Sequence, residues 1–389
     1  MGRKLRIGIL GTRGVPANYS GFETCAEEVS VGLVERGHDV TVYCRRGNAL
    51  GDPTEYKGVR LRYRPHIERK SLGTFTHALT CTLDARRMGF DVLLYFNAAT
   101  APLACLAKLP GGRRPPIVLN VDGLEWKRRK WGLLGRSYYV LAEWLSTKVA
   151  DRIISDARAI QRYYVERWNA PSTFVPYGAH LGGAERPEIL REYGLEPGSY
   201  FLVVGRLEPE NNADLIIEAF HRVATDKRLV IVGGVNYKSA FAARLQRQAN
   251  ARVALLGPVY TPTHVRELYC GAFAYIHGHE VGGTNPALLQ ALGYGGCVLA
   301  LDVPFNAEVV GDAALLYKKD PDDLAAQITR LLAEPLLVQR LRERAAPRIR
   351  EAYRWPHVID GYERILRRAA EGGYRTSPPP DVAYPAAGE

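Results

Sequence analysis

A glycine-rich segment in the second half of the chain, HEVGGTNP at residues 279–286, lies between a short apolar strand pattern and an apolar-periodic helix pattern. Pro286 suits the first turn of a helix, because the N–H that it lacks would have no partner there, and Thr284 or Asn285 can cap the free amides. One interpretation is therefore an ordinary helix start. The other is an anion site, because several amides and the positive end of a helix dipole together attract phosphate. The segment alone leaves both interpretations open.

The elements around this segment alternate between strand and helix patterns in both halves of the chain. We expect strands in the first half at residues 5–11, 39–45, 59–64, 91–97, 116–123 and 152–157, and in the second half at 200–206, 229–234, 253–259, 274–278 and 297–302. Helical periodicity is clearest in residues 24–36, 76–88, 137–149, 213–223, 322–332, 338–353 and 358–370. The alternation predicts the α/β class, with two doubly wound parallel sheets in two domains joined near residues 178–197.

Four of the strand-to-helix loops have unusual sequences. Ligands of open α/β sheets bind beyond the carboxyl ends of the strands, so these loops are the candidate site segments. They are GTRGVPANYSGFET (11–24), NVDGLEWKRRKW (120–131), GRLEPENN (205–212) and HEVGGTNP (279–286). Glycine-bearing loops occur in both expected domains, and we expect two of them to face each other across an interdomain cleft.

The composition is that of a soluble globular protein, with 47% hydrophobic and 24% charged residues in 389. The sequence has no run of 18 apolar residues, which predicts no membrane-spanning helix. The N-terminal segment lacks the pattern of a signal peptide, and the 6 cysteines form no CxxC pair. We therefore expect reduced core cysteines and a cytoplasmic location.

The net charge of +11 is unevenly distributed. Residues 1–180 contain 28 Lys and Arg against 16 Asp and Glu, whereas the remainder contains 24 against 25. The excess is either a solvated surface or a region that meets an anionic partner such as a membrane, a lipid pyrophosphate or nucleic acid. WKRRKW (126–131) places four cations between two tryptophans, either as a solvated helix face or as a membrane-interface segment. No nucleic-acid motif accompanies the charge, so we expect an anionic membrane surface and no nucleic acid.

Several segments, in order over about residues 5–370, resemble the GT-B glycosyltransferases of retaining family 4. They are SGFET with EVSVGLVERGHDVTVYCR, VGRLEPENN with LIIEAF, ALLQALGYGGCVLA and RWPHVIDGYERIL. The resemblance implies two Rossmann-like domains, with the acceptor in residues 1–180 and the nucleotide sugar in 198–352. It also implies a helix at 353–371 that crosses back to the first domain. The composition of residues 372–389 predicts a disordered tail.

GTRGVPANYSGFET, NVDGLEWKRRKW, RLEPENN and VGGTNPALLQA are similar to a bacterial subgroup that includes rhamnosyltransferases of cell-wall and capsular polysaccharides. The similarity implies retaining transfer of a hexosyl group, with dTDP-rhamnose as the expected donor. The acceptor would be lipid-pyrophosphate-linked or a saccharide, and the enzyme would act peripherally at the inner face of the plasma membrane. The alternatives are a UDP- or GDP-sugar donor, or a nucleotide-sugar-binding protein without turnover. A dinucleotide oxidoreductase is disfavoured, because GILGTRGVP does not give GxGxxG in register.

The family resemblance also assigns roles to individual positions. For the donor it points to Ser20, Gly21, Phe22, Gly205, Arg206, Asn211, Gly257, Val259, Glu280, Gly282, Gly283, Thr284, Asn285 and Gln290. Arg206 and the amides of residues 282–285 would hold the diphosphate, with Arg13 a possible assistant from the first domain. Near the acceptor or the membrane we expect Trp126, Lys127, Arg128, Arg129, Lys130 and Trp131.

The sequence departs from the wider family at three of these positions. Asn211 stands where the family has Lys, and Gly282 and Gln290 stand where it has a pair of carboxylates. Gln290 departs from the subgroup as well, although its amide can accept one hydrogen bond and donate another. Glu280 would compensate by reaching the sugar, or it is a solvated loop acid.

Expelling a diphosphate requires positive charge aimed at the leaving group, and Arg206 is the candidate for this role. Asp122 is expected near the reacting centre, where it would orient or deprotonate the acceptor hydroxyl, and Glu125 is the second candidate. The other interpretation of Asp122 is a helix cap. GT-B enzymes do not need a metal ion for chemistry, and no Asp-x-Asp follows a strand. We therefore expect neither a metal nor a cofactor.

Overall fold

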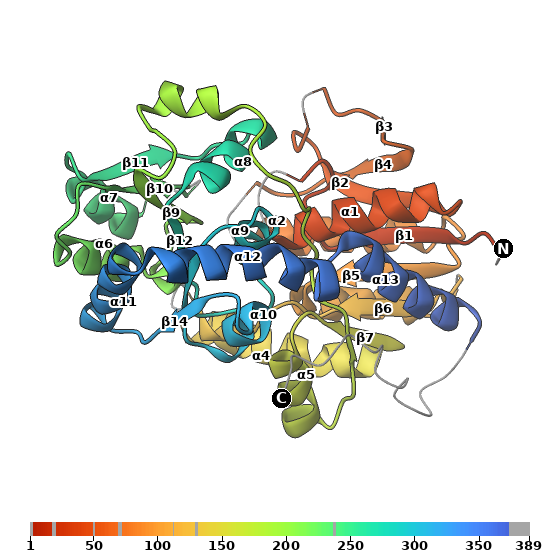
Figure 1. The fold of residues 1–389 in the computed structure, drawn as a ribbon. Coiled ribbons are helices and arrows are strands. Elements are labelled where there is room, and N and C mark those ends of the chain that lie inside the picture. Colours follow the sequence, from red (N-terminus) through yellow and green to blue (C-terminus); the bar gives the residue numbers. More distant parts are fainter. Residues whose placement is uncertain are drawn as a thin grey trace. The chain divides into compact units, whose positions relative to one another are not determined.

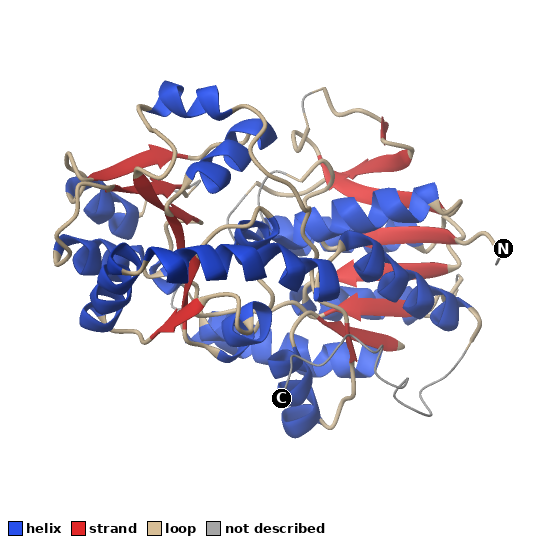
Figure 2. Cartoon of the chain, viewed as in Figure 1, coloured by secondary structure: helices blue, strands red, loops and turns tan. Residues whose placement is uncertain are grey.

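The computed structural model describes residues 3–17, 21–49, 51–68, 72–111, 113–128, 131–235 and 239–372. The chain divides into two compact units. The first unit runs to Tyr177 and resumes at Trp355, and the second is Gly178–Arg354. Both are α/β units (Figures 1 and 2). None of the described helices is long and apolar enough to span a membrane.

The sheet of the first unit has the strand order β3-β4-β2-β1-β5-β6-β7-β8. Its strands are β1 (Arg6–Leu10), β2 (Asp39–Arg45), β3 (Glu55–Tyr56), β4 (Val59–Arg64), β5 (Val92–Phe96), β6 (Ile117–Asn120), β7 (Arg152–Ser155) and β8 (Thr173–Phe174). Every described pairing is parallel except that of β3 with β4. The central strand β5 is buried along its whole length, as expected when helices cover both faces of a parallel sheet.

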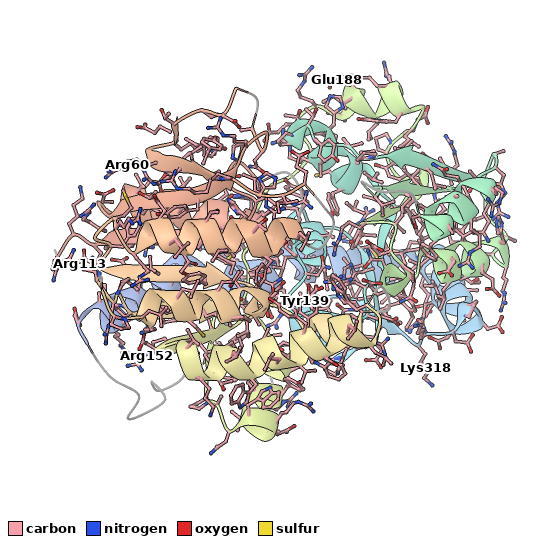
Figure 3. All side chains as sticks on the ribbon, turned by 180° about the vertical axis from the view of Figure 1, so that it is seen from behind. Arg60, Arg113, Tyr139, Arg152, Glu188 and Lys318 are labelled. Atoms are coloured by element: carbon pink, nitrogen blue, oxygen red, sulfur yellow. The ribbon has the colours of Figure 1, made fainter. Side chains whose placement is uncertain are left out.

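Helices α1 (Gly21–Glu35) and α13 (Trp355–Ala370) pack together on one face of this sheet (Figure 1). On the other face lie α2 (Leu72–Ala85), α3 (Ala101–Ala104) and α4 (Leu133–Val149), which are seen from that side in Figure 3. Helix α5 (Arg158–Trp168) contacts β7 and β8. Short 3-10 turns cover Ala98–Thr100, Cys105–Lys108 and Glu125–Lys127.

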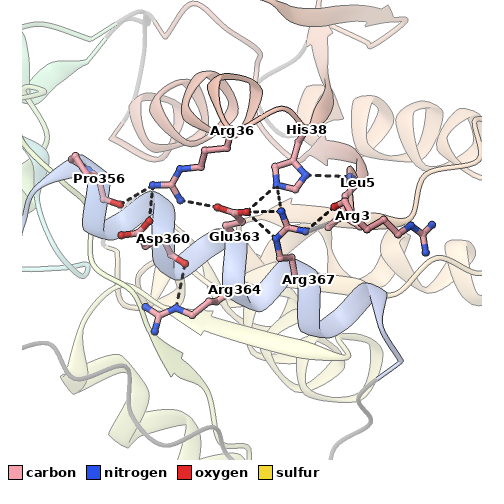
Figure 4. Close-up of polar contacts among 9 residues, drawn as sticks. All are labelled: Arg3, Leu5, Arg36, His38, Pro356, Asp360, Glu363, Arg364 and Arg367. Atoms are coloured by element: carbon pink, nitrogen blue, oxygen red, sulfur yellow. Dashed lines mark hydrogen bonds and ion pairs between the residues drawn. The ribbon is translucent and has the colours of Figure 1, made fainter. Parts of the chain in front are cut away.

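The C-terminal helix is held on the first unit by a cluster of charged side chains (Figure 4). Glu363 of α13 accepts hydrogen bonds from Arg36 at 2.8 Å and from Arg367 at 2.8 Å. The His38 ring accepts from the Leu5 amide through Nδ1, so its Nε2 donates to Glu363 at 3.1 Å. Burial alone would raise the pKa of Glu363, but these three donors lower it from 4.5 to about 2. The predicted helix that returns to the first domain is thus confirmed.

The sheet of the second unit has the order β11-β10-β9-β12-β13-β14, and all its described pairings are parallel. Its strands are β9 (Tyr200–Val204), β10 (Arg228–Val232), β11 (Val253–Gly257), β12 (Ala274–His277), β13 (Val298–Leu301) and β14 (Leu315–Tyr317). Its helices are α6 (Ala213–His221), α7 (Ala240–Arg247), α8 (Pro262–Gly271), α9 (Pro286–Gly293), α10 (Pro304–Val310), α11 (Pro321–Ala333) and α12 (Pro335–Ala352), with 3-10 turns at Pro187–Tyr193 and Pro209–Asn211.

The predicted fold class is confirmed, and the expected strands agree with the observed ones except at their ends. Three strands were not predicted: β3, β8 and β14. They contain two or three residues each, and so short a segment shows no periodicity. The 6 cysteines are unbridged, and Cys25, Cys44, Cys81 and Cys297 are buried as expected, while Cys105 and Cys270 are partly buried. The expected disordered tail lies outside the described residues from position 373.

Candidate functional site

The carboxyl ends of β9 and β10 approach each other closely in the second unit. A Cβ atom on Gly233 would lie 1.8 Å from the carbonyl oxygen of Gly205, and Gly233 has a φ of +140°. Only glycine fits both the contact and the backbone conformation. The backbones that follow β9 and β10 are therefore in direct contact, and the Gly205 amide donates to the carbonyl of Val232 at 3.0 Å.

Arg206 follows β9 directly and is partly buried. Within the described residues its guanidinium has no hydrogen-bond or ion-pair partner in the structure, whereas its carbonyl oxygen accepts from Nδ2 of Asn211 at 2.6 Å. A partly buried cation without a carboxylate partner favours an anionic ligand. Arg206 therefore has the electrostatics expected of a diphosphate-binding residue.

Two loops of the second unit are connected by amide side chains and backbone groups. Oδ1 of Asn211 lies 2.5 Å from Nδ1 of His279, and Nδ2 of Asn212 donates to the carbonyl of Gly278 at 2.8 Å. The Glu280 amide donates to the Glu210 carbonyl at 3.0 Å. The loop after β9 and the loop after β12 therefore form one structure. His279 was missed in the sequence analysis, although it is the first residue of the glycine-rich segment.

The glycine-rich segment ends in a capped helix. The Asn285 side chain accepts from the Ala287 amide at 2.9 Å, and Pro286 occupies the first turn of α9. Thr284 is buried, and Gly282 has a φ of +152°, where a Cβ would lie 2.9 Å from Nε2 of His279. The helix-start interpretation is therefore correct for Asn285. The capped amide, that of Ala287, belongs to the first turn of α9 and not to residues 282–285, whose amides are the ones predicted to hold the diphosphate.

The remaining predicted donor residues are spread along the same edge of the second sheet. The Gln290 amide donates to the carbonyl of His180 at 3.1 Å, and Glu280 forms an ion pair with Lys319. Gly257 ends β11 with a φ of +75°, and its carbonyl accepts from the Gly233 amide at 2.9 Å. Val259 lies two residues further on and is partly exposed. Gln290 and Glu280 are therefore each engaged within this unit.

In the first unit Asp122 lies in the loop after β6, in the left-handed region with a φ of 55°. Its amide donates to Oδ1 of Asn120 at 2.9 Å, and the Tyr177 hydroxyl donates to its Oδ1 at 3.3 Å. Burial raises the pKa of the Asp122 carboxyl, and the nearby Glu125 carboxylate raises it further. The helix-cap interpretation is wrong here, since the following 3-10 turn has Leu124 at its N-cap position and no side-chain cap.

Asn120 and Tyr177 were not predicted as site residues. Nδ2 of Asn120 donates to the Tyr362 hydroxyl at 2.5 Å, which connects the Asp122 loop to α13. The NVDG sequence places Asn120 two residues before Asp122, so this spacing was a usable signal. Tyr177 lies far from Asp122 in the sequence, and nothing in the sequence brought the two together.

Of the segment 126–131, the structure describes residues 126–128 and 131, and these face partly inward. Arg128 is buried and forms an ion pair with Glu125, and Nε1 of Trp131 donates to Glu125 at 3.4 Å. Lys127 is exposed, with Nζ 5.6 Å from the centroid of the Trp126 ring. Glu125 thus anchors its own loop. Arg129 and Lys130 lie outside the described residues.

Two of the predicted donor residues of the first unit are described, and they lie at the start of α1, which follows β1 in the chain. Gly21 and Phe22 are the first residues of that helix, and Ser20 lies outside the described residues. The amide of Arg13 donates to Glu23 at 3.1 Å. This arrangement puts a helix N-terminus at the carboxyl end of β1, where an anion would be attracted.

The described residues contain no cluster of three or more His, Cys, Asp or Glu side chains arranged to hold a metal ion.

Comparison with protein families gives a match in each unit. Residues 20–178 match the family described as "Glycosyl transferase 4-like domain", and residues 185–348 match "Glycosyl transferases group 1". The chain carries the two domains of a GT-B glycosyltransferase. The two matches meet where the chain passes from the first unit to the second.

Two curated proteins illustrate the similarity of this glycosyltransferase to its relatives. It is 25% identical over 291 residues to alpha-maltose-1-phosphate synthase of Mycolicibacterium smegmatis, covering 66% of this chain and 73% of that protein. It is 26% identical over 190 residues to O-antigen chain mannosyltransferase B of Escherichia coli, covering 47% of this chain and 45% of that protein. Neither of these two relatives is named as a rhamnosyltransferase.

Solved structures share the fold at low sequence identity. Sucrose-phosphate synthase from Thermosynechococcus elongatus has a TM-score of 0.80 and 16% identity, covering 95% of this chain and 100% of that one. Anabaena HepE in complex with UDP and glucose has a TM-score of 0.76 and 15% identity, covering 93% and 99%. Identities this low establish the fold alone.

Proposed function

We propose that this glycosyltransferase transfers a hexosyl group from a nucleotide sugar to a lipid-linked or saccharide acceptor in the synthesis of a bacterial envelope polysaccharide. The observation that carries the proposal is the unpartnered guanidinium of Arg206, within the described residues, in the group 1 domain. It follows β9, and the loop that holds it is connected to the glycine-rich segment before α9. When the sugar is transferred to the acceptor, the nucleoside diphosphate is the leaving group, and its negative charge requires such groups.

The residues of the two units have complementary chemical roles in this proposal. Arg206, the amides of the glycine-rich segment and the N-terminus of α9 stabilise the departing diphosphate. Asp122 orients the acceptor hydroxyl and accepts its proton, and Tyr177 holds the carboxylate in place. We propose that no metal ion is needed, because the Arg206 cation and the dipoles of the backbone amides would stabilise the negative charge of the diphosphate. We propose retention of configuration from the resemblance to retaining family 4.

The donor is proposed to be dTDP-rhamnose, with UDP- and GDP-sugars as the alternatives. Support comes from Asn211, Gly282 and Gln290, which stand where the wider family has a lysine and two carboxylates. Asn211 and Gly282 agree with the subgroup that includes rhamnosyltransferases, and Gln290 suits a deoxyribose nucleotide, which offers fewer hydroxyls than a ribose. In contrast, two similar proteins favour a donor other than dTDP-rhamnose. One relative is named as a mannosyltransferase, and the HepE structure contains UDP.

A donor panel tests the proposal. Thermal shift with dTDP, UDP and GDP is followed by turnover of the matching sugar nucleotides on a GlcNAc-pyrophosphate-lipid, with and without EDTA. Arg206→Ala should lower kcat by about 100-fold or more, as expected for loss of a group that stabilises the leaving charge. The matched control is Arg340→Ala, which removes an exposed cation on α12.

A second candidate is a nucleotide-sugar-binding protein without turnover, because neither Gly282 nor Gln290 supplies a carboxylate. Donor binding without transfer on a broad acceptor panel would favour this candidate over the enzyme. Equal kcat for the Arg206→Ala and Arg340→Ala variants would overturn the assignment of Arg206.

A further inference from the structure

The outward face of α4 carries large apolar side chains that the described part of the chain leaves uncovered. Leu133 is 83% exposed, Leu134 90%, Leu141 50% and Trp144 42%. Figure 3 is viewed from the side of the sheet on which α4 lies, and it labels Tyr139 of this helix. Single exposed apolar residues are common, but several on one helix face indicate an interaction surface.

These four side chains lie on one side of the helix. With about 100° per residue, Leu133, Leu134, Leu141 and Trp144 fall within an arc of about 100°, and they extend over about 16 Å along the axis. The opposite side contains Ala142, Glu143, Ser146 and Thr147, all buried against the protein. The outward side of α4 is therefore apolar, whereas three of the four buried residues are polar, and the described part of the chain does not cover the apolar side.

The charged side chains on α4 indicate which kind of partner can bind the apolar face. The helix has a single carboxylate, Glu143, which is buried and accepts a hydrogen bond from Tyr163 at 2.9 Å. Its cations, Arg136 and Lys148, are exposed, and so is Lys127 in the preceding segment. A second copy of the chain would bring like charges together, whereas an anionic lipid surface complements them.

We propose that the outward face of α4, consisting of Leu133, Leu134, Leu141 and Trp144 with the flanking Arg136 and Lys148, docks on an anionic lipid bilayer. The apolar side chains enter the boundary of headgroups and acyl chains, and the cations contact the headgroups. This assignment goes beyond sugar transfer. It also differs from a surface made by residues 126–131 alone, because Arg128 is buried.

Co-sedimentation with vesicles tests the surface without donor or acceptor. The probe is phosphatidylcholine vesicles containing about one third phosphatidylglycerol, compared with phosphatidylcholine alone at low and high salt. The wild type should bind the anionic vesicles and release with salt. The double substitution Leu133→Gln with Leu134→Gln should weaken binding at least about tenfold. The matched control is Leu336→Gln, which changes a leucine that is 74% exposed on α12.

Wild-type protein that stays in solution, or a double variant that binds as tightly as the Leu336→Gln control, would overturn the proposal. So would light scattering that shows a wild-type dimer and a monomeric double variant, since the occupant would then be a second copy. The double variant should keep its far-UV circular dichroism and its nucleotide thermal shift. Turnover with a water-soluble acceptor remains a separate measurement, so failure of the docking surface and failure of the proposed reaction are distinguishable.

Discussion

Oδ1 of Asn211 lies 2.5 Å from Nδ1 of His279, while Nδ2 of the same amide donates to the carbonyl of Arg206 at 2.6 Å. One side chain thus connects the loop after β9, which contains Arg206, to the loop after β12. The two loops come from strands that are neighbours in the sheet but distant in the sequence. Asn211 therefore helps to position both loops, together with the Asn212–Gly278 and Glu280–Glu210 hydrogen bonds.

Two substitutions of Asn211 distinguish the contribution of its contact with His279 from that of its contact with Arg206. Asn211→Ala removes both and should lower kcat/KM for the donor by about tenfold or more, because two hydrogen bonds worth about 1 kcal/mol each are lost. Asn211→Asp keeps an oxygen for His279 but loses the donor to Arg206, and should have an intermediate effect. Steady-state kinetics with varied donor measure both. An unchanged kcat/KM in the alanine variant would contradict this role.

The pKa of Asp122 gives a prediction for the pH profile. Because burial and Glu125 raise this pKa above 3.8, the loss of kcat/KM on acidification should begin at a higher pH than for an ordinary aspartate. Asp122→Asn should lower kcat by about 10²- to 10⁴-fold. Glu125→Gln removes a negative neighbour and should move the acidic limb to lower pH. A limb that moves the other way, or stays fixed, would refute the coupling.

Glu363 should make the attachment of α13 sensitive to acid. Its folded pKa is lowered from 4.5 to about 2, so its contribution to stability is present above the unfolded value and is lost as the pH falls toward 2. At neutral pH, Glu363→Gln should lower the free energy of unfolding by about 1 kcal/mol, allowing for solvent screening. Urea unfolding of both proteins from pH 7 to pH 3 measures the difference. That difference should shrink below pH 4.5; a constant difference would contradict the linkage.

The contact between α1 and α13 depends on Gly32. A Cβ at this position would lie 2.4 Å from Cδ1 and 3.0 Å from Cγ1 of Ile359. Gly32→Ala gains helix propensity of up to about 1 kcal/mol, but the clash should outweigh this gain and give a net destabilisation of about 1–2 kcal/mol. Adding Ile359→Ala should relieve the clash, so the double variant should be more stable than the sum of the single effects. Strict additivity in thermal unfolding would argue against direct packing.

Local patterns in the sequence determined most of the fold. Continuous apolar runs such as residues 92–96 and 200–204 mark strands buried on both faces, and amphipathic periodicity marks the helices, since both signals depend only on neighbours in the chain. The same reasoning placed Arg206 and Asp122 after strands. It did not reveal the short strand β14, whose three residues pair with β13 only once the sheet has formed.

Tertiary structure decided which side chains meet. The pairing of Asn211 with His279, of Asp122 with Tyr177, and of Arg128 with Glu125 depends on the packing of loops, and no spacing in the sequence specifies it for the first two. The tertiary structure also decided which side chains are buried: Arg128 is buried, whereas Leu133 and Leu134 are exposed. The sequence alone sets the types of groups available at each strand end, and the fold sets their distances, exposure and charge environment, because these arise from contacts between distant parts of the chain.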